Sequence, residues 1–153
     1  METTYIFKAK NTHIEYLFKY DLEGHLTTLQ STGEPPTDEQ WHWLVRYFPY
    51  SEERINILAS DTNLRKYFSI EKTPASVTFE DFWEAYGKIG TKSVAKKKFD
   101  KLKPEEVIKA FIGVEKERSK KKLDNTAMPY AEPYLNQKRW EVWTTQAIKN
   151  EPI

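Results

Sequence analysis

The chain has 153 residues and no cysteine, so disulfide bonds, thiolate metal ligands and cysteine nucleophiles are excluded. Hydrophobic residues make up 39% and aromatic residues 14%, which is enough for a folded core in one sizeable domain or two small ones. The net charge of +1 hides an asymmetry, because residues 1–75 sum to −3 and residues 76–153 sum to +4.

Residues 3–31 have the alternation expected of a three-stranded antiparallel β-meander. Apolar side chains occupy every second position in two segments, namely Tyr5, Phe7, Ala9 and then Ile14, Tyr16, Phe18, Tyr20. A weaker third strand is expected near residues 25–30. An aromatic sheet face needs a cover. The helices that follow are the expected cover, and stacking on single-stranded bases is the alternative.

Two helices are expected after this meander. Thr37 and Gln40 form a capping box that begins the first helix. A buried stripe follows it and ends at Pro49, with the members Trp41, Leu44, Val45 and Phe48. Ser51 caps the second helix, whose inward-facing residues are Ile55, Leu58 and Ala59. Residues 64–70 fit a short helix or a strand, and the aperiodic stretch 71–76 indicates a domain boundary.

The second half is expected to be all helical, so the fold class is α+β, with an α+β domain over residues 1–70 and a helical domain over residues 76–150. Thr78 and Asp81 mark a capped helix start. Four rings follow at helical spacing and are expected to pack together, namely Phe79, Phe82, Trp83 and Tyr86.

Two further helices and a closing one are expected in this half. A lysine-rich segment carries Ala95, Phe99 and Leu102 on one side, and Pro104 begins the next helix. The lysines at the end of that helix, Lys120 to Lys122, are explained by the negative pole of the helix dipole. Asn136 is expected to cap the last helix, with Trp140, Trp143, Ala147 and Ile148 facing inward.

Two blocks of this half resemble the C-terminal domain of phage and prophage replication proteins, which include replication initiators, replisome organisers and helicase-loader-associated proteins. The first block is Phe-x-x-Phe-Trp-x-x-Tyr followed by spaced lysines and Lys-Leu, and the second is Tyr-Leu-Asn-x-x-Arg-Trp. The matching residues are Phe79, Phe82, Trp83, Tyr86, Lys88, Lys92, Ala95, Phe99, Lys101, Leu102, Tyr134, Leu135, Asn136, Arg139 and Trp140. The resemblance implies a replication-associated accessory protein of the bacterial host cytoplasm that binds DNA, single-stranded DNA included, or docks a replicative helicase or its loader.

Basic residues outnumber acidic ones by 13 to 5 over residues 88–122. Such a cluster can follow a phosphate backbone, while a solvated helix face is the alternative explanation. With the resemblance, we interpret a group of lysines as candidate nucleic-acid contacts, namely Lys92, Lys96, Lys97, Lys101 and Lys103. At 3.6 residues per turn, Lys92 with Lys96 and Lys97 with Lys101 are expected on adjoining ridges of one helix.

Arg139, between Asn136 and Trp140, has two interpretations. Its guanidinium can grip a phosphate, which makes it a further candidate nucleic-acid contact. Alternatively, it ties the closing segment to a carboxylate or to carbonyl groups at a helix end.

No catalytic residue, metal site or cofactor is expected. The three histidines, His13, His25 and His42, do not have the spacing of metal ligands, and the chain contains no glycine-rich phosphate loop. The paired acids Glu52-Glu53 and Glu105-Glu106 lie at helix starts, where their negative charges interact favourably with the positive end of the helix dipole. No apolar run approaches a membrane span of roughly 18 residues, and the N-terminus lacks a secretion signal, so we expect a cytoplasmic protein.

A second function stays open at this point. The acidic first half favours a protein partner over nucleic acid. The alternative is therefore a small phage-encoded interaction or inhibitor protein that captures a host protein with its aromatic N-terminal sheet.

Overall fold

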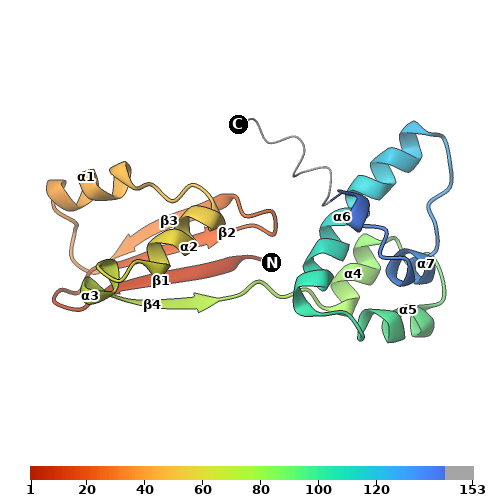
Figure 1. Cartoon of the computed structure of the whole chain (residues 1–153), viewed down its shortest axis with the longest axis horizontal. Helices are drawn as coiled ribbons and strands as arrows, with labels where there is room; N and C mark the ends of the chain where they lie inside the picture. Colours follow the sequence, from red (N-terminus) through yellow and green to blue (C-terminus); the bar gives the residue numbers. More distant parts are fainter. Residues whose placement is uncertain (144–153) are drawn as a thin grey trace. The chain divides into compact units, whose positions relative to one another are not determined.

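The computed structural model of the protein describes residues 1–143. The chain divides into two compact units, Met1–Ala75 (unit 1) and Ser76–Ile153 (unit 2) (Figure 1). Each unit has its own apolar core. Ala147 and Ile148, which we expected to face inward, lie outside the described residues, as does the end of the expected helical domain 76–150.

Unit 1 contains a four-stranded antiparallel sheet, which confirms the α+β class and corrects the expected number of strands. The strands are β1 (Thr3–Ala9), β2 (Glu15–Tyr20), β3 (Leu26–Thr32) and β4 (Phe68–Thr73), in the order β3-β2-β1-β4. In β1, Phe7 lies opposite Tyr16 of β2 on one side and opposite Ile70 of β4 on the other. The undecided segment 64–70 proves to be both elements, a short helix and the start of β4.

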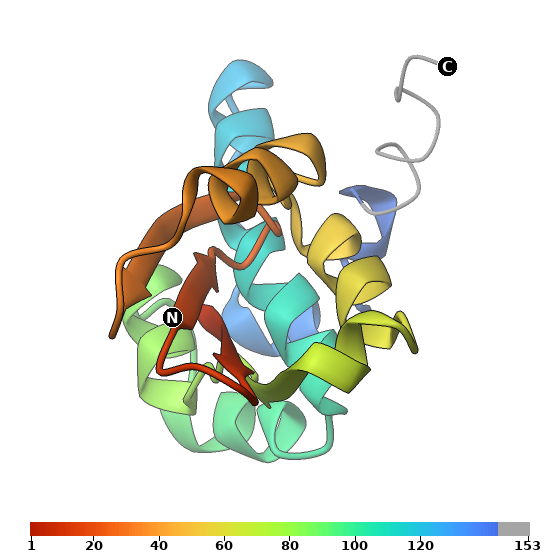
Figure 2. The ribbon, with the colours of Figure 1, turned by 90° about the vertical axis from the view of Figure 1, so that its left-hand side faces the viewer.

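Three helices cover one face of this sheet, as Figure 2 shows. They are α1 (Asp38–Arg46), α2 (Glu52–Ser60) and α3 (Leu64–Tyr67). The buried residues of this unit form one cluster between the layers, consisting of Tyr5, Phe7, Ile14, Tyr16, Phe18, Tyr20, Leu44, Ile55 and Leu64. The aromatic face therefore has the helical cover that its alternation predicts.

The predicted buried face of α1 is wrong in all but one position. Leu44 is buried, but Val45 is 71% exposed, and Trp41 and Phe48 are also exposed. The helix ends at Arg46, so Phe48 lies beyond it, and Trp43 packs against the core instead. The face of α1 that meets the sheet is thus rotated towards Trp43.

Within residues 76–143, unit 2 forms the helices α4 (Phe79–Ala85), α5 (Lys92–Phe99), α6 (Pro104–Leu123) and α7 (Ala131–Asn136). The four rings of the first aromatic stripe are buried, which confirms that they form a core. Phe82 lies 5.7 Å from Phe99 and 6.2 Å from Tyr134 between ring centroids, and Tyr134 lies 5.7 Å from Trp140. Rings from α4, α5 and α7 therefore meet in a single cluster.

The starts of α4 and α6 follow the predicted local signals, whereas α7 does not begin where the sequence predicts the closing helix. Thr78 and Asp81 form the predicted capping box of α4, and Pro104 stands at the first position of α6. Asn136 is the last residue of α7, so the prediction that it caps a helix is wrong. Helix α7 ends at the first residue of the Asn-x-x-Arg-Trp motif, and Trp140 enters the core from the segment after the helix.

Candidate nucleic-acid interface

Helix α5 presents lysines outward because its inner side is apolar. Ala95 and Phe99 are buried in the core of unit 2, while Lys92, Lys96 and Lys97 are exposed. Lys92 pairs with Glu80 of α4 at 3.0 Å, and Lys96 pairs with Asp100 at 2.8 Å. The charges of these two lysines are therefore partly offset by carboxylates.

Lys97 and Lys101 differ from this pair. Within residues 1–143 neither side chain makes an ion pair or a hydrogen bond, and both are exposed. Helix α5 ends at Phe99, so Lys101 lies in the turn before α6 and not on a shared helical ridge with Lys97, which corrects the expected placement. Lys103 is the residue that precedes α6. We call Lys92, Lys96, Lys97, Lys101 and Lys103 the α5 lysine surface.

Arg139 makes the structural contact that one of its two interpretations predicts. Its Nε and Nη2 donate to Oε1 of Glu117 over 2.9 and 2.7 Å, and its Nη1 donates to Gln137 over 3.4 Å. Glu117 is only 4% exposed. The pair ties the segment after α7 to the middle of α6, and its role towards nucleic acid stays a prediction.

Sequence reasoning missed Glu117, although a signal for it exists. Gly113 and Val114 lie three and four residues after Ala110, Glu117 lies four and three residues after them, and all four residues are buried. A carboxylate that continues an apolar stripe needs a partner, because burial of an unpaired charge is costly. The periodicity of α6 thus indicates a buried ion pair at position 117.

Two buried tyrosines complete the core and donate hydrogen bonds to backbone carbonyl groups. The hydroxyl of Tyr86 donates to the carbonyl of Pro129, and that of Tyr134 donates to the carbonyl of Ala110, each over 2.7 Å. Burial raises the pKa of both phenols, so they remain protonated donors at neutral pH. They act as structural ties between loop, helix and core.

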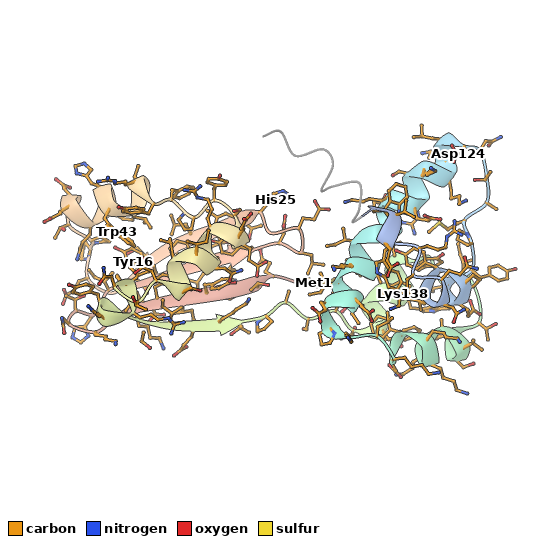
Figure 3. The ribbon with its side chains drawn as sticks, in the orientation of Figure 1. Met1, Tyr16, His25, Trp43, Asp124 and Lys138 are labelled. Carbon is orange, nitrogen blue, oxygen red and sulfur yellow. The ribbon has the colours of Figure 1, made fainter. Side chains whose placement is uncertain are left out.

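Unit 1 holds a groove that sequence reasoning did not find. A cavity of about 390 Å³ lies between α1 and α3, with Tyr16, Trp43 and Leu64 in its lining. A second cavity of about 290 Å³ shares Trp43, Leu64 and Tyr67 with it. We call the two together the aromatic groove, and Figure 3 labels Trp43 and Tyr16 in it. The groove was missed because the predicted face of α1 points elsewhere.

Residues 1–143 contain no group of three or more His, Asp or Glu side chains placed to hold a metal ion. None of the helices formed by these residues combines the length and the apolar character needed to cross a bilayer.

Comparison with known proteins relates unit 2 to a described family of domains. No curated protein and no solved structure matches the chain. A family model does match residues 74–138, from the end of unit 1 to the segment after α7, and its name identifies a vir region protein rather than a phage replication protein. The helical part of this chain, 65 of its 153 residues, is thus similar to the Legionella vir region protein LvrA C-terminal domain.

Proposed function

We propose that the protein is a non-catalytic accessory protein that binds DNA through the α5 lysine surface. The observation that carries this proposal is the pair of exposed, uncompensated charges at Lys97 and Lys101. They lie next to Lys92 and Lys96, whose partners are exposed carboxylates that a phosphate can displace. Lysines of this kind neutralise phosphates and release counterions, which gives affinity without base recognition.

The biological setting that we propose is replication in a phage or prophage, with a replicative helicase or its loader as a further partner. The two aromatic and basic motifs of unit 2 support it, since they resemble those of replication proteins. The family model that matches residues 74–138 is named for a vir region protein and does not itself bear on replication. Docking of a helicase and binding of DNA are compatible roles for one helical unit.

Fluorescence anisotropy of a labelled oligonucleotide over a salt series tests the DNA-binding part. We expect Lys97→Glu plus Lys101→Glu to weaken binding at low salt and to reduce the slope of log affinity against log salt by about 1 for each lysine. The control is Lys10→Glu plus Lys66→Glu at two exposed lysines of unit 1, which changes the net charge equally and should leave binding nearly unchanged. Absence of binding by the wild type at low salt would reject the proposal, as would equal effects of the two double variants.

The aromatic groove favours a second candidate function, capture of a host protein by unit 1. Tyr47 and Tyr67 line it and remain 42% and 62% exposed, which is unusual for large aromatic side chains without a partner. The occupant that fits is a helical segment of a partner protein with bulky apolar side chains, as in other helix-in-groove complexes.

Affinity capture from a nuclease-treated bacterial lysate tests this second candidate. A stoichiometric partner retained by the wild type and lost by Tyr47→Glu plus Tyr67→Glu would support it. Retention of that partner by the double variant, or loss of the partner on nuclease treatment, would contradict it.

A further inference from the structure

A hollow of about 360 Å³ lies in unit 2, where the last turns of α6 face the segment that follows α7. Its lining residues are Glu117, Lys120, Lys121, Gln137, Lys138, Arg139, Glu141, Val142 and Trp143. Lys138, which is labelled in Figure 3, belongs to the segment after α7 that forms one side of the hollow. The volume lies in the range of sites that hold small molecules.

The lining of this hollow is cationic. Four of its residues are Lys or Arg and two are Glu. Arg139 neutralises Glu117, and Lys138 pairs with Glu106 at 2.6 Å. Within residues 1–143, Lys120 and Lys121 have no carboxylate partner. The helix dipole explains why cations are favoured at the end of α6, but not why they surround a hollow.

The guanidinium of Arg139 is fixed at this hollow by its hydrogen bonds to Glu117 and still has donors free for a ligand. A guanidinium has five N–H donors. Three of them are engaged in bonds to Glu117 and Gln137, which leaves two for a ligand. Since Glu117 fixes the side chain beforehand, a phosphate bound there costs less conformational entropy than one bound by a free surface arginine. The two interpretations of Arg139 are therefore compatible.

Trp143 adds an aromatic wall. Its ring packs against the core of unit 2, and Nζ of Lys120 lies 5.9 Å from the ring centroid. The indole N–H is buried and has no hydrogen-bond partner among the described residues. The hollow therefore offers an aromatic ring beside cations, which suit the base and the phosphate of a nucleotide.

We propose that this hollow binds one nucleotide unit of a single strand. Lys120, Lys121 and Arg139 hold a phosphate, and the base lies against the ring of Trp143. A single strand is required because the bases of a duplex are stacked on each other and cannot offer a face to a side chain. The inference rests on the proposed binding of DNA, adds a site separate from the α5 lysine surface, and gives that binding a preference for single strands.

Anisotropy measurements on the full chain, with a labelled thymidine oligonucleotide and a duplex of the same length, test the inference. We expect Trp143→Ala to weaken binding of the single strand about 5- to 150-fold, with little effect on the duplex. Trp143→Phe keeps a ring and should restore most of the affinity. Lys120→Gln plus Lys121→Gln changes only the cationic lining and should weaken single-strand binding without removing the ring, which covers the case in which Trp143→Ala fails to fold.

Separate outcomes bear on the inference and on the proposed function. If Lys97→Gln plus Lys101→Gln weakens binding while the Trp143 and Lys120/Lys121 variants bind single strands like wild type, the hollow is not a nucleotide site and the α5 lysine surface stands. If the wild type binds no nucleic acid, both fail. If Trp143→Ala weakens binding of the single strand and of the duplex equally, the base does not lie against the ring of Trp143. If thymidine monophosphate competes as well as the unlabelled oligonucleotide, the ligand is a free nucleotide and not a strand.

Discussion

Gly113 lies on the buried side of α6, where two aromatic side chains approach the helix. A methyl group at this position would lie 2.6 Å from the hydroxyl oxygen of Tyr134 and 2.7 Å from Cβ of Trp140. Both residues are buried, so neither can retreat easily. The close approach explains why this helix carries a glycine in its middle, where alanine is the better helix former by about 1 kcal/mol.

Replacement of this glycine is the first prediction at the residue scale. We expect Gly113→Ala to lower the free energy of unfolding by about 1–3 kcal/mol, because overpacking outweighs the gain in helix propensity. Urea unfolding measures the change. Ser119→Ala on the exposed side of the same helix is the matched control and should stay within about 0.5 kcal/mol of wild type. A stabilised Gly113→Ala variant would contradict the packing described for Tyr134 and Trp140.

The ion pair between Glu117 and Arg139 gives a second prediction. Arg139→Gln leaves a buried carboxylate without its cation, so we expect a loss of about 3–5 kcal/mol in the free energy of unfolding. Glu117→Gln plus Arg139→Gln should lose less than the sum of the two single variants, since the amides can bond to each other. A double-mutant cycle measures this coupling, and additivity within about 0.5 kcal/mol would argue against a direct pair.

Among whole elements, α4 depends on a capping box that responds to acid. Oδ2 of Asp81 accepts hydrogen bonds from the backbone N–H and the hydroxyl of Thr78, over 2.9 and 2.7 Å. These bonds, the one from the Thr78 backbone first, hold the pKa of Asp81 below its ordinary value of 3.8. The carboxylate thus stabilises the folded state fully above pH 3.8, and this contribution is lost as the pH falls through the lower folded-state value.

The corresponding prediction concerns Asp81→Asn. The variant should be less stable than wild type at pH 7, and the difference should shrink as the pH is lowered below 3.8. Urea unfolding at pH 7, 5, 4 and 3 measures this difference. A gap that is constant over this range would show that the ionised carboxylate does not stabilise the start of α4.

Local signals predicted the helices of this fold better than its sheet. The starts of α1, α4 and α6 were predictable because each rests on residues three positions apart or on a proline at the first turn. Strand β4 was not, since its partner β1 is distant in the sequence and it has one face exposed. The buried face of α1 was mispredicted because its apolar residues, Trp41 to Val45, surround the helix and only the sheet selects among them.

Of the candidate site, only its richness in lysine could be predicted from the sequence. Sequence reasoning could indicate a lysine-rich surface, but the ion pair of Lys92 with Glu80 spans 12 positions and that of Arg139 with Glu117 spans 22. Such pairs, and the hollow beside Trp143, exist only after the helices have packed. Which lysines remain uncompensated is therefore a tertiary property.

For the molecule as a whole, each unit buries its own rings around its own core. The end of unit 1 is closed locally, because the N–H of Ala75 donates to the hydroxyl of Thr3 over 3.2 Å. We therefore expect residues 1–75 and residues 76–153 to fold as separate fragments. Circular dichroism during urea unfolding should show a cooperative transition for each, and a fragment without one would show that its core depends on the other.

The sheet of unit 1 has its first and its last strand side by side, β1 against β4. During synthesis, one edge of β1 therefore stays open until the ribosome has released the chain as far as Thr73. Until then the nascent chain exposes a β-edge beside a partly covered aromatic layer, which is the kind of surface that chaperones recognise.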